Sequence, residues 1–327
     1  SFRSSSNNTF VGNDISAGIS STSNYGFYLF TNSINNTIRN NTISSIGSSF
    51  TEGLVIESGS RNNTLINNII STNGTGGNNY GSYIETGNNT LTGNSISVLG
   101  GIGSSFGIWL FSADASNNLF SFNNISTLSN LSLNDYGIVF SSANNNNITD
   151  SIINATYAAD IRDQSTSAAR NFFIHTTFAT DKNDTSFDGT SVGKLFMQYR
   201  LDVRVTDLRN NPINSATVFA NDTNSVNNIE NPTSNFSSTT NSTGYIPQQI
   251  LTEFMANRTY SGSSQLFFNN YIINASQAGF DSNSTTLNLT QSTSLTIILS
   301  GTPGFTAGTN NTYQGTTLEN DNTVTYS

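Results

Sequence analysis

The chain of 327 residues is poor in charge: 9% of its residues are charged, against about a quarter in an ordinary globular protein, and 34% are hydrophobic. Its net charge is −9 and its 11 basic residues are scattered, which excludes a nucleic-acid partner and a polybasic membrane patch. No apolar run reaches the length of a membrane span, and the absence of cysteine excludes disulfides and thiolate sites.

A ten-residue pattern recurs along the first half of the chain. Its clearest copy is Asn35–Ser44, and its first position starts again after 28, 27, 26, 29, 28 and 25 residues along the series. The copies cover residues 7–16, 35–44, 62–71, 88–97, 117–126, 145–154 and 170–179. A period in the twenties with short strand-like segments and no helical pattern predicts a solenoid.

Each unit has a second fixed part, a glycine followed by alternating apolar residues. Its copies are 26–30, 53–57, 81–85, 107–111 and 137–141, with a weak sixth copy at 159–163. Two short strands per period, separated by Asn, Gly and Ser, predict one coil of a parallel β-helix. The pattern resembles the right-handed parallel β-helix of NosD-like and pectate-lyase-like proteins over about residues 1–180, which implies a fold of six to seven coils and little about activity.

Side chains of a strand alternate between its faces, so the first and third residues after each glycine should point inward. These pairs are Phe27/Leu29, Leu54/Ile56, Ser82/Ile84, Ile108/Leu110 and Ile138/Phe140. The fourth and ninth positions of the ten-residue pattern are also apolar in every copy and should join the same core.

The seventh position of the pattern is asparagine in five successive copies: Asn13, Asn41, Asn68, Asn94 and Asn123. Asparagine tolerates left-handed backbone and bonds locally in turns. We expect a structural ladder of stacked amides at this corner. A row of polar ligand-binding groups is the alternative.

The repeat ends before a polar stretch, residues 181–194, which is expected to be a linker. Its acidic and amide groups offer oxygen atoms that suit Ca²⁺, but their spacing matches no EF-hand loop. A solvated linker is the preferred interpretation, and a structural Ca²⁺ is the one cofactor left open. The candidate ligands are Asp181, Asn183, Asp184 and Asp188.

Residues 195–300 change pattern to many short alternating strands with turn signals, which predicts an antiparallel β-sandwich. The expected strands are 199–205, 216–220, 265–268, 271–275, 286–290 and 295–299, with a polar loop at 222–238. The run Leu201–Phe219 and the turn Asn241–Tyr245 resemble carboxypeptidase-regulatory-like, transthyretin-like modules, and this implies a structural or adhesive Ig-like domain.

Residues 301–327 are rich in Thr, Gly and Asn and are expected to be a linker or an arm that pairs with a neighbour. Ser1 falls partway through a coil and is not an initiator Met, so we expect a processed chain or a piece of a longer one.

The outward side of the glycine-containing strand is the candidate functional surface. Its predicted row is Tyr28, Val55, Tyr83, Trp109 and Val139, and beside it lie Phe30, Glu57, Glu85, Phe111 and Ser141. A contact surface for another protein is the preferred interpretation of such an apolar stripe. Sugar binding by the aromatic rings is the second, and cleavage by Glu57 and Glu85 on adjacent coils is the third.

His175, the only histidine, is expected to be a surface or capping residue, because no oriented partner and nucleophile accompany it. Sequons for N-glycosylation are frequent, although little more so than the composition predicts. They begin at Asn7, Asn35, Asn40, Asn62, Asn73, Asn88, Asn124, Asn130, Asn147, Asn154, Asn183, Asn221, Asn235, Asn241, Asn257, Asn274, Asn283, Asn288 and Asn310.

A β-helix followed by a regulatory-like sandwich resembles archaeal surface-layer and envelope proteins. The sequence therefore predicts a non-enzymatic, N-glycosylated extracellular protein that self-associates into a filament or lattice at the cell surface. A carbohydrate-binding or polysaccharide-processing β-helix protein is the alternative.

Overall fold

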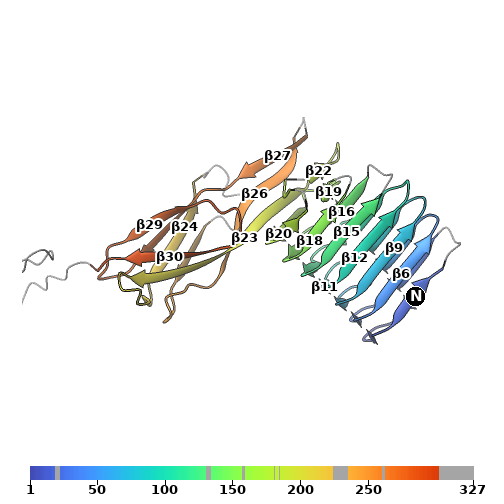
Figure 1. Cartoon of the computed structure of the whole chain (residues 1–327), viewed down its shortest axis with the longest axis horizontal. Coiled ribbons are helices and arrows are strands. Elements are labelled where there is room, and N and C mark those ends of the chain that lie inside the picture. The colour runs from blue at the N-terminus through green and yellow to red at the C-terminus, as the bar shows by residue number, and fades with distance from the viewer. Residues whose placement is uncertain are drawn as a thin grey trace, which may run out of the picture.

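The structure, a computed structural model, describes residues 1–18, 23–129, 134–156, 159–179, 181–183, 185–223, 235–259 and 262–301. Within these ranges the regular elements are β-strands and no helix occurs, so none could cross a membrane. The predicted all-β class and the parallel β-solenoid of about seven turns are confirmed. Figure 1 shows the coils stacked from the N-terminus, with the remaining strands beyond the last coil.

Each coil adds one strand to each of three parallel sheets, so a coil has three strands and not the two predicted, because the ten-residue pattern contains parts of two strands, as in β5 and β6. Sheet A contains β1 (Phe2–Arg3), β4 (Asn24–Phe30), β7 (Thr51–Ile56), β10 (Asn79–Ile84), β13 (Ser105–Phe111), β16 (Asp135–Ser141), β19 (Ile161–Asp163) and β22 (Thr185–Phe187). Sheet B begins with β2 (Thr9–Val11), β5 (Thr37–Arg39), β8 (Thr64–Ile66), β11 (Thr90–Thr92), β14 (Leu119–Ser121), β17 (Asn147–Thr149) and β20 (Arg170–Ile174). Sheet C contains β3 (Asp14–Ala17), β6 (Thr42–Gly47), β9 (Ile69–Gly74), β12 (Ser95–Gly100), β15 (Asn124–Ser129), β18 (Ile152–Ala155) and β21 (Thr177–Phe178).

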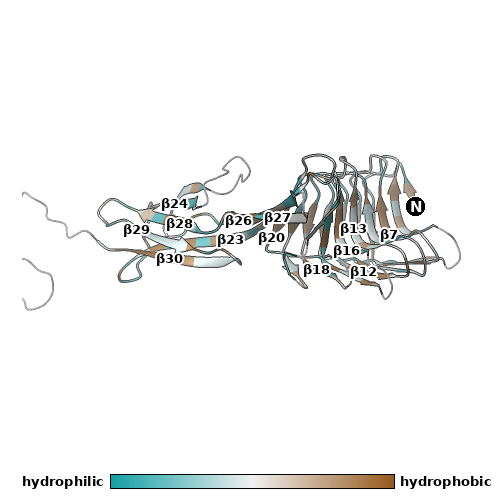
Figure 2. Cartoon of the chain, turned by 90° about the horizontal axis from the view of Figure 1, so that it is seen from above, coloured by the Kyte–Doolittle hydropathy of each residue, from teal (hydrophilic) through white to brown (hydrophobic). Residues whose placement is uncertain are grey.

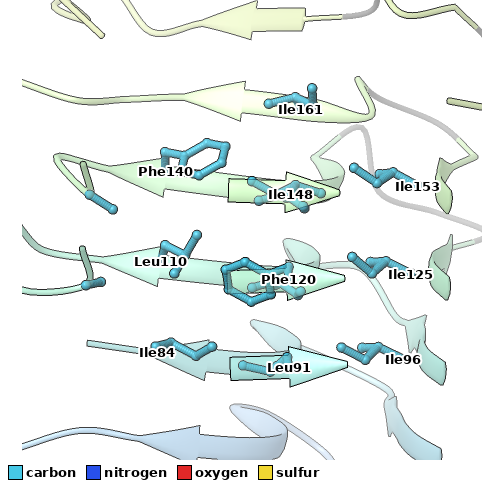
Figure 3. Close-up of a cluster of buried hydrophobic side chains, with 14 of the residues drawn as sticks. Ile84, Leu91, Ile96, Leu110, Phe120, Ile125, Phe140, Ile148, Ile153 and Ile161 are labelled. Atoms are coloured by element: carbon cyan, nitrogen blue, oxygen red, sulfur yellow. The ribbon is translucent and has the colours of Figure 1, made fainter. Parts of the chain in front are cut away.

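The core of the solenoid is built from layers to which each of the three sheets gives at least one large apolar side chain. Ile84, Leu91 and Ile96 form one such layer, and all three are fully buried. Figure 3 shows the next layers repeating the arrangement at the same three places. The residues predicted to point inward after each glycine are buried, so the alternation rule holds on that side of the glycine.

The glycines of sheet A occupy a column where the sheet passes close to sheet C. A Cβ atom on Gly81 would lie 2.3 Å from Ile96 Cγ2 and 2.6 Å from the carbonyl oxygen of Gly107. Gly26, Gly53, Gly107 and Gly137 face the equivalent isoleucine methyl groups at 2.2–2.6 Å. A hydrogen atom is all that fits at this point of each coil, which explains why the glycine recurs.

The five asparagines predicted to stack form one hydrogen-bonded column. The amide nitrogen of each of the first four donates to the amide oxygen of the next coil, as in Asn68 Nδ2 to Asn94 Oδ1 at 2.9 Å, and the backbone N–H of Asn68 donates to the same oxygen. Asn41, Asn68, Asn94 and Asn123 are buried. Ser151 ends the column by accepting from the backbone N–H of Asn123.

A second ladder, which sequence reasoning missed, occupies the second position of the pattern. Neighbouring amides are joined at 2.9–3.3 Å. Its members are Asn8, Asn36, Asn63, Asn89, Asn118, Asn146 and Asn171. The signal was present, since this position is asparagine in all seven copies, whereas the seventh position ends in Ser151 and Thr177.

Replacing Asn68 with leucine should lower the free energy of unfolding by about 1–3 kcal/mol, because buried partners lose their hydrogen bonds. The carbonyl of Ile38 loses a donor, and the backbone N–H of Asn41 loses its acceptor. Urea denaturation measures the change. Asn67→Leu, one residue earlier, tests the turn rather than the stack, because Asn67 has a φ of 52° that leucine adopts poorly. An unchanged urea midpoint for Asn68→Leu would contradict the prediction that the hydrogen bonds of the Asn68 amide stabilise the fold.

The solenoid and the following domain share one strand, β23 (Lys194–Asp207). Its first residues pair in parallel with β20, and its last residues pair in parallel with β30 (Thr293–Leu299). Seen from above, β23 and β26 (Gln249–Thr259) bridge the stacked coils and the sandwich (Figure 2). The expected linker at residues 181–194 is therefore structured in part, because β22 adds to sheet A beside β19.

Beyond the solenoid, strands of two layers enclose a second apolar core, which includes Leu201, Val218 and Tyr271. One layer is the antiparallel four-stranded sheet D, and the other contains β23, β26, β27 and β30. Sheet D consists of β25 (Phe236–Thr239), β24 (Thr217–Asp222), β28 (Tyr271–Ser276) and β29 (Asn283–Leu287). In the other layer, β27 (Gly262–Phe267) pairs with β26. Three features differ from the expectation: β30 runs parallel to β23, β26 forms where no strand was predicted, and β25 begins inside the predicted loop at 222–238. Residues 224–234 of that loop lie outside the described residues.

Candidate functional site

The outer face of sheet A carries three columns of side chains, one more than the sequence predicted. The additional column precedes the glycines and contains Tyr25, Glu52, Tyr80, Phe106 and Tyr136, which are in register on adjacent strands. Strict alternation places these residues inside. The glycine breaks the alternation, because Gly81 and the buried Ser82 both face the core. Tyr80 therefore lies outside, packed against Tyr83 and Trp109.

The predicted row is less exposed than an open apolar stripe. Val55 and Val139 are 1% and 0% exposed, and Tyr28, Tyr83 and Trp109 are half-buried. The rings cover one another: Tyr83 and Trp109 have centroids 5.3 Å apart, and Trp109 and Phe111 have centroids 4.9 Å apart. The expected exposed stripe is therefore a packed aromatic layer outside the solenoid.

This layer is divided into two aromatic blocks by β7. On one side, β4 carries Tyr25, Tyr28 and Phe30, with ring centroids 4.5–5.0 Å apart. On the other side, β10 and β13 carry the larger block around Trp109. β7 presents Glu52 and Val55, and Glu57 follows its last residue, so two acids lie between the two aromatic blocks.

Tyrosine hydroxyls fix the carboxylates at one edge of this face. Tyr28 donates to Glu57 Oε1 on the next coil, and Tyr83 donates to Glu85 Oε1 at 2.5 Å. Burial raises the pKa of both tyrosines, and the bond to a carboxylate raises it further, so both hydroxyls keep their protons.

Glu52 lies on the same face but is nearly enclosed, with 8% of its surface exposed. Burial raises the pKa of Glu52 to about 8, and the negative charges of Glu57 and Glu85 add to the effect. This carboxyl is protonated at neutral pH and can donate a hydrogen bond. Such a group has the chemistry of a general acid, but its enclosure hinders contact with a glycosidic oxygen.

The C-terminal end of the face is closed by polar contacts. Trp109 Nε1 donates to Ser141 Oγ at 2.8 Å. Arg162 lies over the ring of Tyr136, with its guanidinium carbon 4.9 Å from the centroid, and it binds both carboxylate oxygens of Asp188 at 2.8 and 3.0 Å. This arginine is held by its neighbours and does not reach the glutamates by any contact that the structure describes.

The proposed Ca²⁺ ligands do not converge on one point. Asp181 accepts hydrogen bonds from Asn183, whereas Asp188 binds Arg162 in sheet A. Asp184 lies outside the described residues. In the parts of the chain that the structure describes, no group of three or more acidic or histidine side chains could hold a metal ion.

His175 lies where the solenoid meets the sandwich. Its Nδ1 is 2.8 Å from Asp150 Oδ1, and its side chain is 52% exposed. Arg200 of β23 binds both oxygens of Asp150 at 2.6 Å. The arginine, with the histidine, lowers the pKa of this carboxyl, despite the opposing effect of burial. The cluster clamps the shared strand to the coil of Asp150, so its geometry is that of a structural contact.

None of the sequon asparagines in the described ranges is buried. Asn35, Asn62 and Asn88 are exposed in left-handed turns, with φ between 57° and 60°. Asn7, Asn40, Asn73, Asn124, Asn183, Asn235, Asn241, Asn283 and Asn288 are also exposed, and Asn147, Asn154, Asn221, Asn257 and Asn274 are half-exposed. Asn130 and Asn310 lie outside the described residues.

Comparisons of the sequence with protein-family models and with curated proteins gave no match.

Proposed function

We propose that this chain is a non-enzymatic, N-glycosylated structural protein of the extracellular surface and a subunit of a filament or lattice. The observation that carries the proposal is the division of its asparagines into two sets. Asparagines of both ladders are mostly buried and hydrogen-bonded and begin no sequon, whereas sequon asparagines of the described residues reach solvent. The rod can therefore carry glycans along its edges without disturbing its core.

The continuous strand between solenoid and sandwich supports the same proposal. Backbone pairing of β23 with strands of both halves makes one extended body rather than two tethered ones. The low charge and the stacked ladders fit a protein whose task is to hold a shape. The proposal includes three further assignments: a NosD-like β-helix, an Ig-like sandwich, and a place in an archaeal surface layer.

Glycopeptide mass spectrometry of native-source protein should find glycans on at least one of Asn35, Asn62 and Asn88. Electron micrographs of the same material should show filaments or a lattice. The ladder residues Asn36 and Asn63 serve as internal controls and should be unmodified. Bare asparagine at all three sequons, together with a monodisperse monomer at high concentration, would contradict the proposal.

Carbohydrate binding at sheet A is the second candidate, favoured by the aromatic blocks on either side of Glu52 and Glu57. Incubation with acidic and neutral polysaccharides separates binding from cleavage. Shortening of any polymer, abolished by Glu57→Gln with Glu85→Gln, would replace the structural proposal with an enzymatic one.

A further inference from the structure

The outer face of sheet A combines two features that the structural role does not use. The first is a set of carboxyl groups without a cation. None of the ion pairs found among the described residues involves Glu52, Glu57 or Glu85. Glu52 is more than nine-tenths buried, and the structure describes no hydrogen bond to its carboxyl group.

The second feature is the pair of aromatic walls beside these acids. Val55, the outward residue between Glu52 and Glu57, is 1% exposed, and its register partners on the flanking strands are Tyr28 and Tyr83. At 1% exposure Val55 is covered by its neighbours, so a ligand on this face meets the half-exposed rings of Tyr28 and Tyr83 and not the valine between them. An aromatic ring attracts a cation to its face, and a carboxylate nearby adds charge attraction.

We propose that this face binds a saccharide chain that carries ammonium groups, with the ammonium groups between Glu57 and Glu85 and the sugar rings against Tyr28, Tyr83 and Trp109. Charge complementarity selects a cationic ligand. A second copy of this chain is a poor occupant, because its net charge is −9 and repels an acidic face.

The repetition along the rod favours a saccharide chain over a single small amine. Adjacent coils place equivalent side chains about 4.8 Å apart, a spacing comparable with the length of a pyranose ring. Glu57 and Glu85 follow each other at this spacing, as do Tyr83 and Trp109. A linear amino-sugar chain that runs along the rod therefore meets a carboxyl group at two successive coils, Glu57 and Glu85, with aromatic rings on both sides of them.

The fluorescence of Trp109 reports binding directly, since the chain has one tryptophan. The probe is a β-1,4-linked glucosamine tetramer at pH 6, and the matched control is the same tetramer with acetylated amines. We expect the charged tetramer to bind about tenfold more tightly than the acetylated one, and less tightly as salt rises. Equal affinity for the two tetramers would overturn the proposal, as would no binding of either.

Two variants of the full-length chain locate the site. Glu57→Gln with Glu85→Gln should weaken binding of the charged tetramer about tenfold, because the neutral amides keep the shape and remove the charges. Tyr28→Phe, which keeps the ring, should weaken it only about twofold to threefold. Circular dichroism checks the fold of each. Unchanged binding in the double variant would overturn the site.

A third probe, spermine, distinguishes the contribution of the sugar rings to binding from that of the ammonium groups. It carries four ammonium groups, as the charged tetramer does, but no ring to stack on tyrosine. We expect it to bind at least about tenfold more weakly, because ring stacking is lost. Affinity equal to that of the tetramer would overturn the saccharide and indicate a polyamine or a basic peptide.

Discussion

The Gly81→Ala variant should be less stable than the wild-type chain by about 3 kcal/mol, the upper end of the usual cost of overpacking, because the added methyl group has no space. It would meet the carbonyl oxygen of Gly107 at 2.6 Å and Ile96 Cγ2 at 2.3 Å. The carbonyl belongs to the backbone of the next coil and cannot rotate away. Urea denaturation, followed by far-ultraviolet circular dichroism, measures the loss.

The sign of this change is informative, because replacing glycine with alanine within a strand ordinarily stabilises a protein by about 0.5–1 kcal/mol. Gly18→Ala is the matched control. A Cβ at Gly18 meets nothing within 4 Å, so its stability should change by less than about 0.5 kcal/mol. A Gly81→Ala protein as stable as Gly18→Ala would show that the two sheets are not in close contact at the glycine.

The second large effect is a fall in stability with rising pH that depends on Glu52. Its pKa is raised from an ordinary value of 4.5 to about 8 in the folded chain, first by burial and then by Glu57 and Glu85. Between these two pH values the folded state keeps the proton and the unfolded state releases it. The free energy of unfolding therefore decreases as pH rises from about 4.5 to about 8.

The full decrease assigned to Glu52 is on the order of 5 kcal/mol, since each pKa unit corresponds to about 1.4 kcal/mol. Glu52→Gln cannot ionise and should remove this part of the slope. Urea denaturation of both proteins at pH 5 and pH 8.5 gives the difference, which cancels the contributions of Asp163 and Glu253, whose pKa values are also raised by burial.

The groups around Glu52 allow a control. Tyrosines of β4 and β10 pack on either side of it, and the nearby negative charges are Glu57, directly after β7, and Glu85, directly after β10. Glu85→Gln removes one negative neighbour but leaves the buried acid, so most of the slope should persist. Equal slopes in wild type and Glu52→Gln would mean that this carboxyl is hydrated rather than enclosed.

Much of the solenoid could be predicted because the repeat marks each layer of the core in the sequence. Ile84, Leu91 and Ile96 stand at fixed places in their copy, and strand alternation is enough to place them inside. The first ladder could be predicted for the same reason. The second was missed although its signal is stronger, because in the first four copies its asparagine is the middle residue of a sequon.

The candidate site was only half predictable. Tyr83 and Trp109 follow from alternation, but Glu52 and Tyr80 lie on the other side of a glycine that breaks it. Close contact between two sheets, a tertiary property, decides which way those side chains point. The parallel pairing of β30 with β23 is similarly invisible in the sequence, because a strand's pattern shows its buried face and not its neighbour's direction.

The strand shared by the two halves has a mechanical consequence. The backbone hydrogen bonds between neighbouring strands run across the strand direction. A pull along β23 therefore loads many of them in shear, and they must break together. The same bonds resist a twist of the sandwich about the solenoid axis, and the Asp150–Arg200 clamp adds a second point of fixation. If the solenoid is anchored at its far end, the shared strand therefore holds the sandwich at a fixed distance and orientation from the anchor.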